Sequence, residues 1–162
     1  MNIEHTIEDV LNKQIKYEFE TAYSYLGLAA ALAATPYSGF AHWMKKQYEE
    51  ELEHAMKLYE YIQERQGCVK LQNFECPTYT LKSPLEAFQL AYKLELDNTQ
   101  HIHEAYNLAV KEGDLPTQIF LQWFINEQVE EEANCQDFIS KLTAANDCSC
   151  SLFAIDHEAG KR

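Results

Sequence analysis

The sequence predicts one all-α domain over residues 1–162: a bundle of four long helices, with one long crossover loop between the second and third, and a short fifth helix or tail. Three observations predict this fold. Glycine (5 residues) and proline (4) are scarce, which favours long helices over a turn-rich β fold. Apolar residues recur every three to four positions in four separate stretches. One of the connections between the stretches is much longer than the others.

The first helix is expected at residues 6–33, where Thr6 and Asp9 resemble a capping box and a proline shortly after the end stops the pattern. Glu18 interrupts the apolar positions of this helix. Tyr25 lies two turns further on and nearly in line with Glu18, which places it within reach of the same spot.

The second helix is expected at residues 37–66, with Gly67 as its C′ residue. Its inward stripe contains two polar residues, Glu51 and His54. Their spacing puts them ~60° apart around the helix axis and ~4.5 Å along it, so both side chains can point at one spot. A carboxylate beside an imidazole suits iron, manganese or zinc better than calcium or magnesium.

Residues 68–83 form the long connection, which can cross the length of the bundle and leave the second and third helices parallel. A four-helix bundle with one such crossover is the ferritin-like arrangement. Ser83 and the following proline open the third helix, expected at residues 84–112, and Glu95 interrupts its apolar stripe.

The fourth helix is expected at residues 115–144, antiparallel to the third because the turn between them is very short. Residues 148–162 form a tail that either makes a short fifth helix or packs on a neighbouring subunit. The expected inward stripe of the fourth helix consists of Ile119, Phe120, Trp123, Phe124, Glu127, Glu131, Cys135, Phe138, Ile139 and Leu142.

Composition limits the partners and the compartment. The net charge of −13 argues against nucleic acid or an anionic membrane, since both need a basic surface. The first ten residues lack the pattern of a secretory leader, and the longest apolar run is too short for a membrane span. We therefore expect a cytoplasmic protein whose five cysteines, an odd number, are reduced.

Each long helix thus carries a polar group at mid-length on an otherwise apolar face. Such residues could be unrelated surface groups, but a coincidence on four helices is improbable, and a buried charge is costly unless it is paired or bound to metal. The sequence therefore favours a metal site built from Glu18, Glu51, His54, Glu95, Gln128 and Glu131.

The stretches that carry these residues resemble the non-haem bacterial ferritins. The similarity is carried by residues 11–18, 50–55, 92–95 and 120–132 and extends from about residue 11 to 156. Haem is not expected, because Leu52 stands where the haem-binding relatives have methionine, and helix four has Gln128-x-x-Glu131 in place of a second Glu-x-x-His.

The resemblance implies a di-iron ferroxidase centre with a third iron position beside it. Glu18 and His54 would be terminal ligands of one iron, and Glu51 would bridge the two. Glu95 would hold the second iron, with Glu131 next to it. Gln128 would lie near the first iron without being a strong ligand, and the aromatic residues near the centre would be Tyr25 and Trp123. The third position would use Glu50, Glu127, Glu130 and Glu131.

The resemblance also implies a homo-oligomeric shell of 24 subunits that oxidises Fe2+ to Fe3+ with O2 or H2O2 and stores a ferric mineral. The expected channel residues are Asp114 and Gln118, and the expected acidic lining of the interior is Glu50, Glu53, Glu60 and Glu130. The alternatives are a non-storing di-iron oxidase or peroxide-detoxifying protein on the same bundle, and a catalytically silent shell. Retention of the ligand set disfavours the silent shell, whereas the acidic lining and the lack of any substrate-binding insertion disfavour the oxidase.

Overall fold

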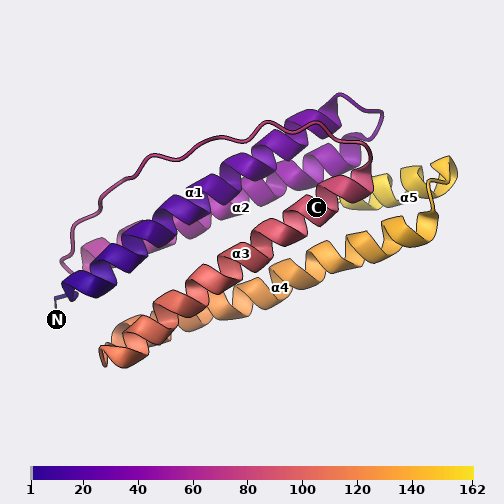
Figure 1. Cartoon of the computed structure of the whole chain (residues 1–162). Coiled ribbons are helices and arrows are strands. Elements are labelled where there is room, and N and C mark those ends of the chain that lie inside the picture. Colours follow the sequence, from indigo (N-terminus) through magenta and orange to yellow (C-terminus); the bar gives the residue numbers. More distant parts are fainter. Residues whose placement is uncertain (1) are drawn as a thin grey trace.

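The computed structural model describes residues 2–162, and in this range all regular structure is helical. Five helices follow one another along the chain (Figure 1). The fold class is confirmed: four long helices form a bundle, and a short fifth helix packs at one end of it (Figure 1). The helices are α1 (His5–Ala33), α2 (Ser38–Glu64), α3 (Pro84–Lys111), α4 (Leu115–Ala145) and α5 (Ser149–Ala159).

The connection between α2 and α3 runs the full length of the bundle beside α1, without regular structure (Figure 1). It carries the chain back to the end at which α2 began, so α2 and α3 point the same way. Helix α1 packs mainly on α2, and α3 mainly on α4. No helix among residues 2–162 combines the length and the apolar character that crossing a membrane requires.

Helix α1 begins earlier than its sequence predicts. Its N-cap is Glu4, whose side chain makes no capping hydrogen bond, and Thr6 lies inside the helix. The carbonyl of Glu4 already accepts the amide of Glu8 (2.9 Å), so the first turn is closed before Thr6. The expected capping box of Thr6 and Asp9 is therefore wrong.

The C′ position of α2 lies one residue earlier than the sequence predicts. Gln66, not Gly67, adopts the left-handed conformation, with φ of 58°. The Gly67 amide bonds the Ile62 carbonyl (2.8 Å), as the C″ residue of a Schellman motif does. Glycine is needed at this C″ position for space, because a Cβ on it would lie 2.8 Å from Cγ2 of Ile3.

Capping at the starts of α3 and α4 uses side chains. The Ser83 hydroxyl accepts the Glu86 amide (3.2 Å), as the sequence predicts. Asp114 caps α4 by accepting the Thr117 amide (3.1 Å). Both Asp114 oxygens also accept hydrogen bonds of 3.0 Å from the Arg65 guanidinium. Asp114 is buried in this pairing, and its carboxylate ties α4 to the end of α2.

Helix α5 packs on its own bundle. Its Asp156 carboxylate accepts the amide of Phe40 (2.8 Å), one of the unpaired donors in the first turn of α2. Gly39 allows this contact, since a Cβ there would lie 1.8 Å from the Asp156 carbonyl oxygen. Leu152 and Ala159 of α5 are buried in the core.

The core consists of two apolar clusters separated by a polar layer. One cluster, at the α5 end, is built around Tyr25, Phe40, Trp43, Phe88 and Phe138. The other, towards the α3–α4 turn, is built around Ile7, Leu11, Leu58, Ile102 and Phe124. Every long helix carries buried candidate ligands that lie in sequence between the two clusters: Glu18, Glu51, His54, Glu95, Gln128 and Glu131.

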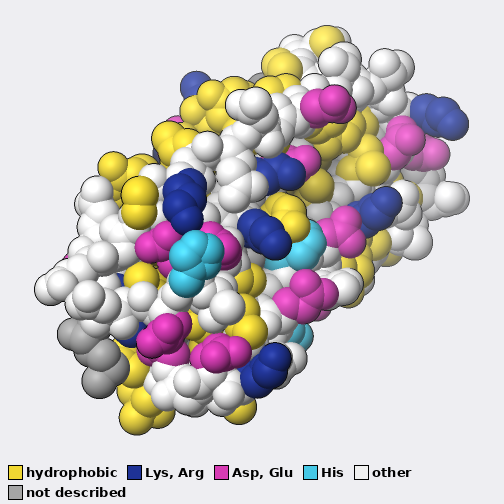
Figure 2. All heavy atoms as spheres, turned by 60° about the vertical axis from the view of Figure 1, so that its left-hand side comes forward, with side chains coloured by type: hydrophobic (Ala, Val, Ile, Leu, Met, Phe, Trp, Pro, Cys, Tyr) yellow, Lys and Arg dark blue, Asp and Glu magenta, His cyan; other side chains and the backbone are white. Residues whose placement is uncertain are grey.

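One face of the molecule carries a mixture of charged side chains. On the face shown in Figure 2, acidic, basic and histidine side chains are interspersed.

Candidate metal centre

Three side chains of the polar layer form a ready-made ligand set. One ligand atom from each of Glu18, Glu51 and His54 lies within 4.8 Å of the other two, and all three residues are buried. Glu18 comes from α1, whereas Glu51 and His54 come from one face of α2 because they are three residues apart. Two carboxylates and an imidazole at this separation can hold one first-row divalent ion.

The carboxylate of Glu51 has no hydrogen-bond partner although it is completely buried. Among the buried side-chain nitrogens and oxygens of residues 2–162, four lack a partner, and three of them are both oxygens of Glu51 and Nδ1 of His54. The His54 Nδ1 lies 3.4 Å from Oε2 of Glu51, which is close enough for attraction but does not form a hydrogen bond. Unpaired buried polar atoms are rare and costly, so this group is matched to a cation.

Electrostatics agrees with this interpretation. Burial, followed by repulsion from Glu95 and Glu18, raises the pKa of Glu51 well above its usual range. Without a cation Glu51 is therefore harder to ionise than an ordinary carboxyl group. A bound divalent ion would reverse this, because it stabilises the ionised carboxylate.

Two amides hold Glu18 in place. Nε2 of Gln14 donates to one oxygen of Glu18 (2.7 Å), and Nδ2 of Asn98 donates to the other (3.1 Å). Gln14 also donates to Oδ1 of Asn98 (2.6 Å), so the amides orient each other. The sequence analysis did not identify either amide residue. The signal was their position one helical turn from a candidate ligand: Gln14 precedes Glu18, and Asn98 follows Glu95.

Glu95 lies on the α3 side of the layer, where it accepts hydrogen bonds from two other residues. The Tyr25 hydroxyl donates to its Oε1, and Nε2 of Gln128 donates to its Oε2 (3.1 Å). Burial raises the pKa of Glu95 to about 7 although both hydrogen bonds lower it. Tyr25, expected near Glu18, thus contacts the opposite carboxylate.

Glu131 of α4 is held in a similar way. Nε2 of the buried Gln47 donates to its Oε2 (2.7 Å). Burial and then the charge of Glu95 raise the pKa of Glu131 to about 7. Glu95 and Glu131 therefore belong to the same polar layer as the three-residue set. Both oxygens of Glu95 and Oε2 of Glu131 accept hydrogen bonds from protein donors.

The other acidic residues expected at the centre lie outside the layer. Glu50 and Glu127 line a recess of about 480 Å³ that also reaches His54. Glu130 is exposed and does not line this recess. In the described chain these residues do not form a ready ligand cluster with Glu131.

The predicted inward stripe of α4 is partly wrong. Ile119 and Trp123 are 60% and 38% exposed. The buried line instead passes through Leu121, Phe124 and Gln128, about one residue further round the helix. Trp123 still lies near the centre, with its ring 5.4 Å from that of His54.

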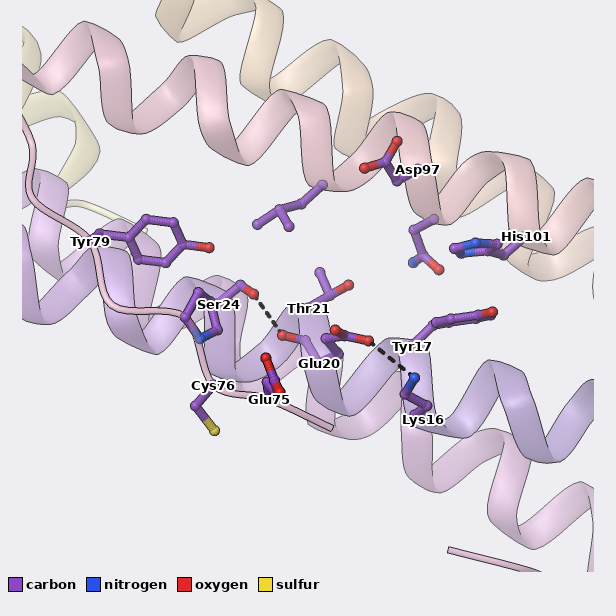
Figure 3. A pocket seen from close by; sticks show the side chains of 13 residues that line it. Lys16, Tyr17, Glu20, Thr21, Ser24, Glu75, Cys76, Tyr79, Asp97 and His101 are labelled. Atoms are coloured by element: carbon purple, nitrogen blue, oxygen red, sulfur yellow. Dashed lines mark hydrogen bonds and ion pairs between the residues drawn. The ribbon is translucent and has the colours of Figure 1, made fainter. Parts of the chain in front are cut away.

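A second recess, of about 620 Å³, opens between α1, α3 and the crossover (Figure 3). Acidic side chains from all three segments lie around it: Glu20, Glu75 and Asp97 (Figure 3). Asn98 is part of its lining, and the same side chain bonds Glu18. A single side chain therefore links this recess to the buried ligand set.

Comparison with known proteins agrees with the fold. Residues 8–145 match the family model described as ferritin-like domain. The bacterial non-heme ferritin of Bacteroides fragilis is 34% identical over 160 residues, covering 99% of both chains. That of Staphylococcus aureus strain MRSA252 is 33% identical, covering 95% of this chain and 93% of the relative. The solved open pore ferritin from Archaeoglobus fulgidus superposes with a TM-score of 0.97 at 40% identity, covering 99% of each chain.

Proposed function

The chain belongs to the ferritin family, and on this premise we propose that it is an iron-storage ferroxidase. It oxidises Fe2+ to Fe3+ with O2 or peroxide at a two-iron centre and keeps the product as a ferric mineral inside a shell of 24 copies. The observation that carries this proposal is the fully buried Glu51 carboxylate, which has no partner and faces Glu18 and His54.

The substrate Fe2+ ions bind where the polar layer offers negative charge without a counter-ion. Glu18 and His54 hold the first ion, and Glu51 lies between the two positions. Glu95 and Glu131 hold the second ion. For this to happen, the Tyr25 and Gln128 donors must share Glu95 with the ion, and the Gln47 donor must share Glu131. Protons held by Glu95 and Glu131 leave as the ions bind, so uptake releases protons.

Oxidation at this centre is balanced as a two-electron reaction. Each Fe2+ gives one electron, and O2 takes both electrons and two protons to leave as H2O2. The carboxylates favour this step because they stabilise the higher charge of Fe3+. Gln128, a neutral amide where haem-binding relatives have glutamate, binds iron on this side of the centre only weakly, so that Fe3+ can move on towards the interior.

Glu50, Glu127, Glu130 and Glu131 form the third iron position in this proposal. Its support is the recess beside His54, which Glu50 and Glu127 line. Glu53 and Glu60 line the same recess. The recess therefore offers a negatively charged path between the buried centre and the face that we assign to the interior of the shell.

The experiment adds several hundred equivalents of Fe2+ per shell, in air, to metal-free protein, and then separates the products by size exclusion while protein and iron are followed together. We expect iron to co-elute with a particle of about 450 kDa, since each of 24 chains has a mass of 18.8 kDa. Uptake that stops at two or three ions per chain would indicate a non-storing oxidase, and a small oligomer would refute the shell.

A further inference from the structure

Arg162, which follows α5, lies against the acidic edge of the proposed centre. Its Nη2 is 2.5 Å from Oε2 of Glu50, and its Nη1 donates to Oε1 of Gln47. The guanidinium also lies 5.0 Å from the ring centroid of Trp43, and the Arg162 carbonyl oxygen is 3.0 Å from Nε2 of His42. These contacts with α2 give the side chain a defined position.

Gln47 connects this arginine to the polar layer. The amide of Gln47 is completely buried; its oxygen accepts from Arg162, and its nitrogen donates to Glu131 (2.7 Å). The positive charge of Arg162 acts on Glu131 as well, since it lowers the pKa of Glu131 against the effect of burial. Arg162 therefore contacts one carboxylate of the proposed third position and reaches another through a single amide.

We propose that Arg162 is the built-in counter-cation of the third iron position. Its guanidinium neutralises Glu50, and through Gln47 it restrains Glu131, for as long as no metal ion occupies that position. A metal ion that binds the same oxygens has to displace the guanidinium, so the third ion binds last and most weakly. This role rests on the third position of the proposed function.

The contacts also allow a purely supporting role, and the two roles predict opposite results. If Arg162 competes with the ion, removing its charge tightens the third position. If Arg162 only orients Glu131, removing it loosens the second ion of the buried centre. Repulsion between a unit charge and a divalent ion roughly 5 Å apart in water-like surroundings weakens binding by about tenfold, which is the size of effect to expect.

The test titrates metal-free protein with Zn2+ in a calorimeter, so that no oxidation takes place. In R162Q we expect the third ion to bind about tenfold more tightly than in the unmodified protein, and the two tighter ions to bind as before. Lys161→Gln is the matched control, because it removes the same charge from the exposed neighbouring residue; its third ion should bind as in the unmodified protein.

A third ion that binds R162Q no more tightly, or no third ion at all, would overturn the role of Arg162 while leaving the two-ion centre in place. Weaker binding of the second ion in R162Q would overturn it in favour of the supporting role. If the unmodified protein lacks the two tighter ions, the proposed centre fails, and this role fails with it.

Discussion

The metal-free protein should lose stability as the pH rises from 5.5 to 8. Burial raises the pKa of both Glu95 and Glu131 from 4.5 to about 7. The metal-free native state therefore binds these two protons more tightly than the unfolded chain does. Their stabilising contribution is complete below pH 4.5, and it is lost as the pH rises through 7. Carboxylates with a lowered pKa, such as Asp114, change the free energy of unfolding only at pH values below this window.

The size of the effect follows from the two pKa values. A carboxyl group whose pKa moves from 4.5 to about 7 on folding lowers the free energy of unfolding by about 3 kcal/mol at pH 8, relative to its value below pH 4.5. For a chain of this length 1 kcal/mol shifts the melting temperature by roughly 2–4 °C. Loss of the proton from one such carboxyl therefore lowers the melting temperature by about 6–12 °C at most. Loss of the protons from both carboxyls lowers it further.

Scanning calorimetry of chelator-treated protein at several pH values measures this fall. Glu131→Gln removes one of the three carboxyl groups whose pKa is raised (Glu51, Glu95 and Glu131), so it should make the fall smaller. Excess Zn2+ should abolish it, because the ion takes the place of the protons. A melting temperature of metal-free protein that stays level or increases between pH 5.5 and 8 would refute the assignment of raised pKa values to an empty metal layer.

Three further predictions concern the centre, the third position and α5. Replacing Glu18 and His54 by alanine should slow Fe2+ oxidation in stopped-flow measurements by roughly 100-fold, with the elution volume of the shell unchanged; an unassembled variant would show that these residues are structural. Glu130→Ala should change the number of Fe2+ ions oxidised per O2 consumed in an oxygen electrode, and an unchanged ratio would remove Glu130 from the third position. Gly39→Ala should destabilise the protein by about 3 kcal/mol, because its Cβ would lie 1.8 Å from the Asp156 carbonyl oxygen; a normal melting temperature would mean that α5 is not docked as described.

The polar layer was predictable because its members interrupt apolar stripes. Glu18, Glu51, His54 and Glu95 each occupy a position that the 3–4 residue spacing assigns to the core, and the structure buries all four. The scarcity of glycine and the long segment after α2 likewise determine the bundle and its crossover. These features depend on periodicity and length, which one sequence contains.

The hydrogen bonds within the layer were not predictable in the same way. Tyr25 lies on the same helix as Glu18 but donates to Glu95 of α3. The partner depends on how each helix is rotated about its own axis relative to its neighbours, and apolar spacing leaves that rotation uncertain by about one residue. The same uncertainty explains why Ile119 and Trp123 were expected inside the bundle and are exposed.

The end of α2 was hard to predict because two adjacent residues could each take the C′ position. Gln66 and Gly67 are adjacent, and glycine is the more common C′ residue. The structure nevertheless places Gln66 at the left-handed position, with φ of 58°, because the space beside Ile3 and Ile62 admits only a glycine at the next position. Contacts between residues far apart in the sequence therefore decide a boundary that local propensity assigns differently.

The most direct test of the metal centre is anomalous diffraction at the iron absorption edge from crystals loaded with Fe2+ without oxygen. We predict one peak within bonding distance of Glu18, Glu51 and His54, and a second between Glu51 and the pair Glu95 and Glu131. Iron peaks confined to the surface, with the buried Glu51 carboxylate still without a partner, would contradict the account.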